Sequence, residues 1–307
     1  MKLAGEIARI IEDATRQAAH HQHERGDGAV IAVSKPAASA GSLSLRSLEV
    51  GSDIGPGRGL RDEVSPSNSL IPISAYIANQ SRIAAAGAHL IVHEDAPEAR
   101  VFGSADNAGM AFVTRPRKFV AIDAAPFGLV PDGSEVSATD ERVYRSQIEW
   151  NGPSYAVRHE LTRERLRVFG LEHVSAELAE SIAMGLARAA DHSLLSAIAA
   201  LTPSAFSIAA AATAGLDWSD LRAIIGTDAT GAHISEDGTL RAAGIVAALT
   251  NTTPGTLAGS FRHAAVSVQD NIRVSVAREI NGSLTFTCWA DFDAMLPRAD
   301  VFWSVTA

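Results

Sequence analysis

Apolar residues recur at helical spacing near the start of the chain. Across residues 3–23, one face carries Leu3, Ile7, Ile10, Ile11, Ala14 and Ala18. This spacing predicts an amphipathic helix, and the pairs Arg9–Asp13 and Glu12–Arg16 would support its polar side. The apolar stripe must be buried, either against the rest of this chain or against a neighbouring molecule.

The clearest helical pattern spans residues 175–201. Its apolar positions are Leu178, Ile182, Leu186, Ala190, Leu194, Ile198 and Leu201. Ser175 is the expected N-cap, and Pro203 is expected to end the helix. At 1.5 Å per residue this helix is a rod of roughly 40 Å, and one face should be covered along its length.

Alternation of apolar and polar residues predicts strands on both sides of the long helix. The expected strands are Ala88–Val92, Arg142–Trp150, Ser154–Leu161, and residues 265–268, 272–276, 284–292 and 301–305. Asn151-Gly152 predicts a tight hairpin turn. Asn281-Gly282-Ser283 and Leu296-Pro297-Arg298 predict the connections between the closing strands.

The remaining segments define the order of the fold. Residues 98–140 hold short apolar runs broken by glycine, proline and aspartate, so this β excursion should project. Trp218–Ile225 predicts a short helix, and Leu240–Leu249 should pack inside. The class is α+β, because the regular βαβ alternation of parallel-sheet enzymes is missing.

The composition is that of a globular protein. The chain has 307 residues, of which 47% are hydrophobic and 20% charged, enough for a large core or two subdomains. No run approaches the roughly 18 apolar residues of a membrane span, and the early acidic residues argue against a secretory signal. Cys288 is the single cysteine, which excludes an intrachain disulfide and fits a reducing cytoplasm. We expect no membrane partner.

The formal net charge is −9. A protein that binds nucleic acid by itself is usually basic, because it must neutralise phosphates. The charge suits instead a container wall that must not adhere to DNA. Lysine is confined to Lys2, Lys35 and Lys118, which reflects either a GC-rich genome or a preference for arginine at subunit interfaces.

No residue is predicted to be catalytic, to bind a cofactor or to ligate a metal. The clustered histidines His20, His21 and His23 have no acidic or cysteine partner. His89 and His93 have only Glu94 nearby. Both groups therefore lack the ligand set of a typical metal site.

Other candidate motifs also have structural explanations. Cys288 lies in an alternating strand and is expected to be a buried small residue. Arg158-His159-Glu160 is expected to be a solvated or interface strand, and Asp191-His192 a polar face or an interface of the long helix. Gly51–Gly59 lacks the Gly-Lys-Ser/Thr ending of a phosphate loop, so it is expected to be an extended linker or arm.

Three stretches follow one another in a characteristic order. They are Ser69-Leu70-Ile71-Pro72 with Ser81–Ala88, Tyr155–Leu166 running into the long helix, and Gly259 to Phe302 at the end. In this order they resemble the Hong Kong ninety-seven type major capsid proteins of tailed bacteriophages. The resemblance implies a capsid fold with an N-terminal arm, an extended β loop, a long spine helix, a peripheral-domain sheet and a small axial domain.

The resemblance also implies domain boundaries. Residues 1–50 would be a helix and linker, either scaffold-like or an added arm, and 51–69 the N-arm. Residues 100–154 would be the extended loop, with its tip near 120–138. The peripheral domain would comprise residues 70–99, 155–203 and 258–307 around the spine helix 175–201, and the axial domain 204–257. This layout makes Asn151-Gly152 a kink rather than a hairpin, and it is the favoured interpretation.

The function implied by the resemblance is structural and not enzymatic. The subunit would form pentamers and hexamers of an icosahedral phage or prophage head that encloses double-stranded DNA, in a virion assembled in the bacterial host cytoplasm. Further candidate partners are a portal, a scaffolding protein, a maturation protease and a decoration protein. Some family members crosslink a loop lysine to a neighbour's asparagine. Only Lys118 is available and it precedes the expected tip, so no crosslink is predicted.

Aromatic residues of the excursion are candidate interface anchors, although each could instead pack within its own subunit. They are Phe112, Phe119, Phe127, Tyr144 and Trp150. Two alternative functions remain open. One is an encapsulin-like nanocompartment shell that holds an enzyme cargo. The other is a cytoplasmic hydrolase or lyase that uses the histidines and elutes as a monomer or small oligomer.

Overall fold

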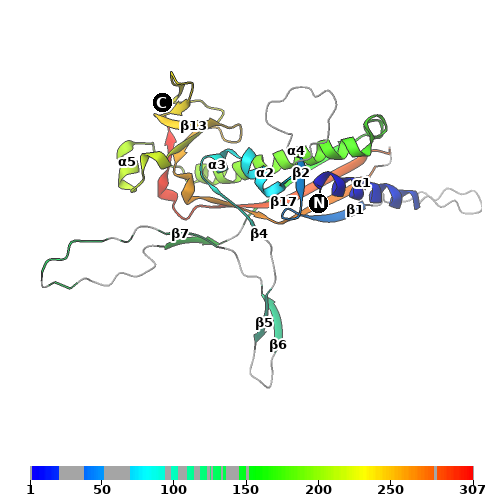
Figure 1. The fold of residues 1–307 in the computed structure, drawn as a ribbon, viewed down its shortest axis with the longest axis horizontal. Coiled ribbons are helices and arrows are strands. Elements are labelled where there is room, and N and C mark those ends of the chain that lie inside the picture. The colour runs from blue at the N-terminus through cyan, green and yellow to red at the C-terminus, as the bar shows by residue number, and fades with distance from the viewer. Residues whose placement is uncertain are drawn as a thin grey trace, which may run out of the picture.

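The computed structural model describes most of the chain outside the arm and parts of the excursion. The described residues are 2–20, 38–51, 70–93, 98–102, 109–113, 118–122, 125, 127–132, 134–135, 145–149, 152–279 and 282–306. They form a body of helices on a sheet, a smaller sheet at one end, and two projecting ribbons (Figure 1). The α+β class is confirmed. No helix in these ranges is long and apolar enough to cross a membrane.

The main sheet is organised around its longest strand, β17 (Leu284–Met295). One edge of β17 pairs with β9 (Ser154–Leu161). The other edge pairs with β15 (Ala265–Gln269) and β16 (Asn271–Arg278). Only Asp270 separates β15 from β16 and both run antiparallel to β17, so they follow one another along the same edge.

Two further strands, β1 (Ala38–Ser44) and β4 (His89–His93), complete the far side of the main sheet. β1 pairs antiparallel with β16, and β4 pairs parallel with β15. The buried Asp270 ties these pieces together. Its carboxylate accepts hydrogen bonds from the Ser44 hydroxyl and the Arg46 backbone N–H, both at 2.8 Å. Its own N–H donates to the last carbonyl of β4 at 2.6 Å.

Helix α4 (Arg163–Ala200) packs on the main sheet, and Thr162 caps its first turn. The helix is interrupted at Gly170, whose φ of 78° and ψ of 159° are readily adopted only by glycine. The predicted start at Ser175 is wrong, because Ser175 lies inside the helix and donates its hydroxyl to a backbone carbonyl one turn earlier. The helix ends just before Pro203, as predicted.

Helix α1 (Leu3–His20) confirms the first predicted helix. Its buried residues are Leu3, Ile7, Ile10, Ile11 and Ala14. They pack on α4, β1 and β16 of the same chain. On the polar side, Arg9 lies 3.7 Å from Asp13 and Arg16 lies 2.7 Å from Glu12. The stripe is therefore buried within the chain and does not need a neighbour.

Short elements connect α1 and β1 to the rest of the body. β2 (Glu49–Gly51) pairs with β3 (Leu70–Pro72). α2 (Ile73–Gln80) and α3 (Arg82–Ala85) follow and contact α4. Residues 38–51 thus belong to the body and are not a linker. Residues 52–69 of the expected N-arm lie outside the described residues.

The second sheet has the strand order β11–β12–β13–β10–β14–β18. Its strands are β10 (Arg222–Ile225), β11 (Ala232–Ile234), β12 (Leu240–Ala242), β13 (Ile245–Leu249), β14 (Thr256–Gly259) and β18 (Phe302–Val305). The nearby helices are α5 (Ile208–Thr213) and the 3-10 helices Trp218–Asp220, Phe261–His263 and Ala299–Val301. β18 was expected in the peripheral-domain sheet and instead closes this one.

Two predictions within this sheet need correction. Trp218–Ile225 is not a helix but a 3-10 turn followed by β10, which ends in three consecutive buried residues. A strand buried on both faces has no alternation, so its apolar run was mistaken for a helical pattern. Leu240–Leu249 forms the hairpin β12–β13 and is only partly internal, because Leu249 is exposed.

The β excursion forks into two ribbons. β5 (Glu98–Phe102) pairs with β6 (Gly109–Val113), and β7 (Lys118–Ile122) pairs with β8 (Arg145–Glu149). Neither ribbon pairs with either larger sheet in the described part of the chain. Figure 1 shows the two ribbons leaving the body in different directions. The sequence predicted a single excursion and not this fork.

The hairpin that turn chemistry alone predicted at Asn151-Gly152, against the favoured kink, is wrong, because β8 pairs with β7 and β9 pairs with β17. Gly152 serves a different purpose. A Cβ at this position would lie 2.1 Å from the Phe292 carbonyl oxygen. The Phe292 N–H donates to the Pro153 carbonyl at 3.1 Å. Glycine therefore allows the returning chain to approach β17 closely. Asn151 itself lies outside the described residues.

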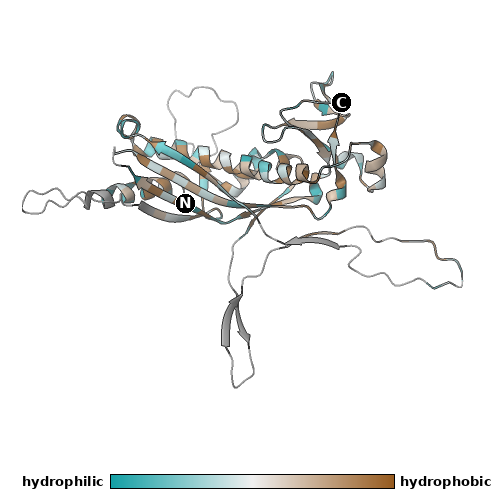
Figure 2. Cartoon of the chain, turned by 180° about the vertical axis from the view of Figure 1, so that it is seen from behind, coloured by the Kyte–Doolittle hydropathy of each residue, from teal (hydrophilic) through white to brown (hydrophobic). Residues whose placement is uncertain are grey.

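The core lies between the main sheet and the helices α1 and α4, and it continues into the second sheet. Along β17, buried residues largely alternate with partly exposed ones. Figure 2 shows the corresponding change of hydrophobic and hydrophilic colours along the strands. The predicted connection between β16 and β17 contains Gly282 at a φ of 85°, which fits a tight turn.

Candidate subunit-contact surfaces

The described histidines are not part of a cluster that could hold a metal ion. His89 is exposed, and its ring lies 5.7 Å from the ring of Phe119. His93 is buried, and its Nδ1 lies 2.9 Å from the Ser267 hydroxyl. No group of three or more metal-ligating side chains occurs within the described ranges. The side chain of His20 and the residues His21, His23 and Glu94 lie outside them.

Cys288 is buried, as its alternating strand predicted. Burial raises the pKa of its thiol to about 12. The thiolate is the nucleophilic form of cysteine, so this thiol is unreactive near neutral pH. Arg158 on the adjacent strand β9 forms an exposed ion pair at 3.7 Å with Glu279, which directly follows β16.

Asp191 does not lie on the polar face that the long helix was expected to present. It is 3% exposed. Its Oδ1 accepts hydrogen bonds from the Ser81 hydroxyl at 2.6 Å and the Ile83 N–H at 3.2 Å, and its Oδ2 accepts from the Arg82 N–H at 3.1 Å. Asp191 thus holds the first turn of α3 against α4. His192 points elsewhere and is exposed, so the two residues are not a catalytic pair.

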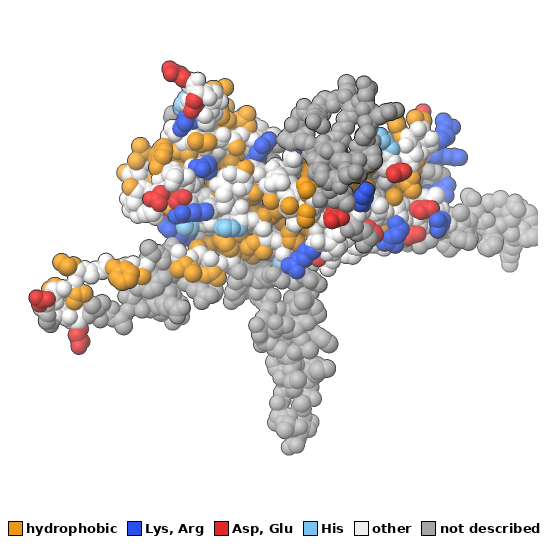
Figure 3. All heavy atoms as spheres, viewed as in Figure 1, with side chains coloured by type: hydrophobic (Ala, Val, Ile, Leu, Met, Phe, Trp, Pro, Cys, Tyr) orange, Lys and Arg blue, Asp and Glu red, His pale blue; other side chains and the backbone are white. Residues whose placement is uncertain are grey.

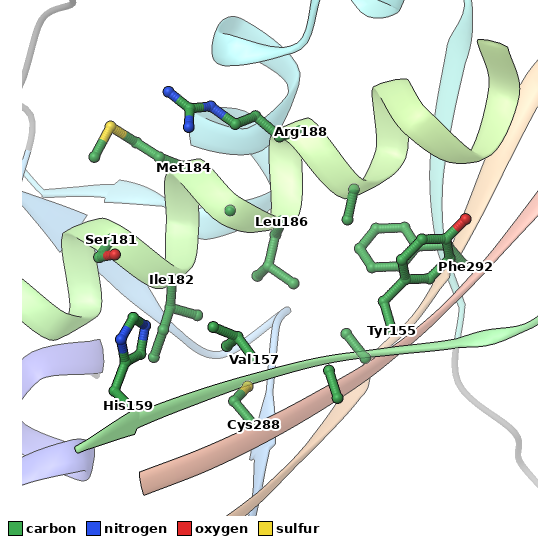
Figure 4. Close-up of a pocket in the computed structure, with 14 residues that line it drawn as sticks. Tyr155, Val157, His159, Ser181, Ile182, Met184, Leu186, Arg188, Cys288 and Phe292 are labelled. Carbon is green, nitrogen blue, oxygen red and sulfur yellow. The ribbon is translucent and has the colours of Figure 1, made fainter. Parts of the chain in front are cut away.

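An apolar groove of about 310 Å³ runs between β9 and α4. Figure 4 shows Ile182 and Leu186 reaching from α4 towards β9, with Val157 opposite them. Tyr155 lies at one end of the groove and His159 at the other. Val157 is 39% exposed even though it faces the helix side of the sheet. The helix therefore leaves part of β9 uncovered.

Two features keep this groove accessible. In the described part of the chain β9 pairs only with β17, so the outer edge of β9 carries no partner strand. Gly185 lies on the α4 wall, and a Cβ built there meets no atom within 4 Å. An exposed glycine inside a helix costs about 1 kcal/mol relative to alanine, so this position lowers helix stability and leaves space.

The tip beyond β7 is the most exposed apolar surface. Phe127 is 99% exposed and Leu129 is 98% exposed. Figure 3 shows hydrophobic atoms beside acidic ones at the far end of this projecting excursion. The acidic residues are Asp132 and Glu135, which are also exposed. We define the tip as residues 127–135.

The aromatic candidates of the excursion therefore separate. Phe127 is free to act as an interface anchor, whereas Phe119 is half-buried against His89 of its own subunit. The side chain of Phe112 and the residues Tyr144 and Trp150 lie outside the description.

Two further exposed apolar groups occur on the body. The second sheet and its surroundings expose Ile208, Trp218, Ile234, Val246 and Leu249. The short arm of α4 before Gly170 exposes Val168 and Phe169. That arm is linked to the main helix because Glu177 accepts a hydrogen bond from Arg165 at 2.6 Å. The described part of the chain thus presents three exposed apolar surfaces besides the groove.

Sequence reasoning found the tip but missed the groove. The groove depends on the pairing of β9 with β17 and on the position of α4, neither of which a local pattern reveals. One signal was available. Gly185 interrupts an otherwise favourable helical sequence, and a glycine inside a helix has a packing or functional reason in many proteins.

No protein-family model and no curated protein matches the sequence. Solved structures do match. The capsid of the native GTA particle is 12% identical, with 84% of this chain and 97% of that chain covered and a TM-score of 0.45. The satellite phage P4 procapsid with its size determination (Sid) protein is 10% identical, with 76% and 96% covered and a TM-score of 0.43.

A virus-like particle from Pyrococcus furiosus is also similar, at 9% identity, with 76% of this chain and 97% of that chain covered and a TM-score of 0.41.

Proposed function

We propose that this chain is the major structural subunit of a protein shell, the head of a phage or prophage. Pentamers and hexamers of the subunit would close into an icosahedral container for double-stranded DNA. One observation carries the proposal. Phe127 and Leu129 are almost completely exposed at the end of a projecting limb, and large exposed apolar groups of this kind mark binding surfaces.

The three apolar surfaces suit repeated contacts between identical subunits. In a ring, each subunit presents one surface forwards and a different one backwards, so several distinct patches are required on every copy. The tip, the second sheet and the short arm of α4 are such patches. The net charge of −9 fits a wall that encloses DNA without adhering to it. No sequence-specific DNA contact is proposed.

The domain layout follows from this proposal. Residues 70–99, 155–203 and 258–301, with α4 as the spine, would form the peripheral domain, whereas β18 would belong to the axial domain because it pairs with β14. Residues 204–257, which hold most of the second sheet, would form the axial domain near ring centres. Residues 100–154 would be the extended loop and 51–69 the N-arm. Portal, scaffolding, protease and decoration proteins are proposed as further partners.

Electron microscopy of the purified full-length protein tests the proposal. We expect closed shells of uniform size after negative staining. A protein that stays monomeric or dimeric at all concentrations and salt conditions contradicts the shell and favours the hydrolase or lyase alternative. That alternative has little support now, because His89 is exposed while His93 is buried.

The contents of the shells separate the phage head from the encapsulin-like compartment. Nuclease-protected DNA, together with portal and tail proteins, is expected for a head isolated from its host. A co-purifying enzyme cargo without DNA instead identifies a nanocompartment. Both have the same wall, so the outcome changes the cargo and the location in a virion but not the role of this subunit.

A further inference from the structure

Strands β1 and β4 end beside each other at one corner of the main sheet. β1 ends at Ser44, opposite Asn271, and β4 ends at His93, opposite Gln269. Asp270 is the residue between these two partners. The β excursion leaves the body directly after β4, so its exit lies next to the turn that follows β1.

Asp270 connects this turn to the exit. It is 4% exposed, and its carboxylate accepts hydrogen bonds from the Ser44 hydroxyl and the Arg46 N–H, both at 2.8 Å. Its carbonyl accepts from the Leu45 N–H at 2.9 Å, and its N–H donates to the His93 carbonyl at 2.6 Å. Buried donors and acceptors are costly to leave without partners, so these bonds fix the turn relative to the end of β4.

Two side chains hold the last residues of β4. Within the described residues β4 is an edge strand that pairs only with β15, and a strand paired on one side opens more easily than a central one. Arg46 Nη2 donates to the Val92 carbonyl at 2.9 Å. The Ser267 hydroxyl lies 2.9 Å from Nδ1 of His93, and both residues are 1% exposed. The turn thus supports the strand through Arg46.

β4 also contacts the ribbon formed by β7 and β8. The ring of His89 lies 5.7 Å from the ring of Phe119 on β7, at an angle of 47°. No strand pairing joins this ribbon to either larger sheet in the described part of the chain. The orientation of the ribbon therefore depends on side-chain contacts such as this one and on the position of β4.

We infer that the turn at residues 44–47 is a clamp that sets the orientation of the β7–β8 ribbon. Asp270 positions the turn, and Arg46 of the turn holds the end of β4. β4 in turn holds the ribbon through His89 and Phe119. The N-terminal part of the chain and the excursion are thereby coupled. All of these contacts lie within one chain, so the clamp goes beyond the shell function and acts before any second copy is met.

The first experiment measures the orientation of the ribbon in the full-length protein. Nitroxide labels are placed at Ile122→Cys on β7 and Leu201→Cys after α4, where the native side chains are 77% and 47% exposed. Cys288 is buried and should take no label. Labelled protein is diluted into excess unlabelled protein, so that electron paramagnetic resonance reports only distances within one chain.

We expect one narrow distance distribution in the labelled chain and a broad or shifted one after Arg46→Ala. This variant removes an exposed side chain and keeps the backbone N–H that Asp270 accepts. Arg16→Ala is the matched control, because it removes another exposed arginine, bonded to Glu12 at 2.7 Å on α1. It should leave the distribution unchanged. Arg46→Lys keeps one charged donor and should restore most of the narrow distribution.

The second experiment separates the clamp from a general contribution to stability. Hydrogen exchange followed by mass spectrometry compares β4 with β9 and β17. Arg46→Ala should raise exchange in β4 on the order of tenfold and leave β9 and β17 unchanged, because only β4 opens locally. Asp270→Asn removes a carboxylate acceptor of the turn, so it should raise exchange at the ends of both β1 and β4.

Several outcomes would overturn the inference. A distance distribution that Arg46→Ala leaves unaltered shows that the turn does not orient the ribbon. A distribution that is already broad in the labelled chain shows that the ribbon has no fixed orientation. Exchange that rises equally in β4, β9 and β17 shows a loss of overall stability only. Neither measurement requires assembly, so electron microscopy decides the shell function separately.

Discussion

At the residue scale, the buried carboxylate of Asp191 fixes the relation between two helices. It accepts three hydrogen bonds from the first turn of α3 while sitting on α4. Its pKa is raised because burial disfavours the charged form, and this outweighs the lowering by the Ser81 hydroxyl, the Arg82 and Ile83 N–H groups and the Arg82 charge. The carboxyl group stabilises the fold through the positions of its two acceptor oxygens and not through its charge.

Asp191→Ala should lower the free energy of unfolding by about 2–4 kcal/mol, since it leaves the buried donors at the first turn of α3 without an acceptor. Urea unfolding measures this loss. Asp191→Asn should cost less, because one acceptor oxygen remains. A loss below about 0.5 kcal/mol for the alanine variant would show that water replaces the carboxylate.

The same residue should give stability a pH dependence. The native state holds the proton of Asp191 more tightly than the unfolded state does, because the folded pKa is raised. The contribution of Asp191 to the free energy of unfolding is therefore complete below its pKa in the unfolded state. It is lost as the pH rises through its pKa in the folded state. Lowering the pH should thus stabilise the unmodified protein relative to Asp191→Asn. A difference that stays constant with pH contradicts this.

Cys288 provides a second test at this scale. With a pKa of about 12 and a buried side chain, its thiol should resist a thiol reagent at pH 8 for hours. It should react within minutes in denaturant. Fast labelling of the native protein would show that β17 opens locally.

The sequence predicted whether a residue is buried better than it predicted which residues it contacts. The alternating strand predicted a buried Cys288 correctly, because alternation reports which face a residue occupies. The same reasoning placed Asp191 on a polar face or at an interface of the long helix, because an aspartate inside a helix is normally solvated. Its true partners lie more than a hundred residues earlier in the chain, and no local pattern indicates such a pairing.

At the element scale, helix α4 contains two glycines with different roles. Gly170 has a backbone conformation that a residue with a side chain adopts only with strain. Gly185 has ordinary helical geometry and open space around it. One glycine shapes the backbone, and the other leaves room beside it.

Substitution by alanine should therefore have opposite effects at the two positions. Gly170→Ala should destabilise the protein by about 1–3 kcal/mol, or straighten the helix at this point. Gly185→Ala should stabilise it by about 0.5–1 kcal/mol through helix propensity. Thermal melts of both variants measure the difference. Equal and small effects would mean that the interruption at residue 170 is not a stable feature.

Periodic elements were predictable, and interrupted ones were not. The apolar stripe of α1 was read correctly, because an amphipathic helix shows its period in full. The start of α4 was missed, because Gly170 breaks the pattern. The local turn preference of Asn151-Gly152 alone predicted a hairpin, whereas the favoured interpretation was a kink. Tertiary pairing of β8 and β9 with other strands overrides that preference.

At the scale of the whole molecule, the excursion leaves and rejoins the main sheet at nearby points. It leaves after β4 and returns at β9, and only β15 and β17 lie between these strands. At about 4.8 Å per strand, the two roots are about 14 Å apart. Roughly six extended residues can bridge this distance. The body therefore does not need the excursion in order to close.

Replacing residues 95–151 by a linker of about eight glycine and serine residues should leave a folded body that no longer assembles. Circular dichroism and light scattering test the two parts of this prediction. A truncated chain that cannot fold would show that the excursion stabilises its own subunit, and shells formed without it would remove its role in assembly.

Covalent crosslinking between subunits should be absent. Lys118 opens β7 and precedes the tip, and no lysine follows it in the sequence. Shells boiled in detergent should release a single band of 32.1 kDa on a denaturing gel. A ladder of covalent oligomers would refute this.

The whole-molecule arrangement could be predicted only in outline. The order of helix, excursion, long helix and closing strands follows from periodicity, and it led to the α+β class. The fork of the excursion and the placement of β18 in the second sheet depend on pairings between distant segments. Those pairings are decided by packing and not by local sequence.

The pairing of β1 with β16 has a consequence for how the protein is made. Ser44 pairs with Asn271, which lies more than two hundred residues later in the chain. During translation β1 must wait until β16 has been synthesised, and such distant pairing folds slowly. A nascent chain thus cannot complete its main sheet before β16 has left the ribosome.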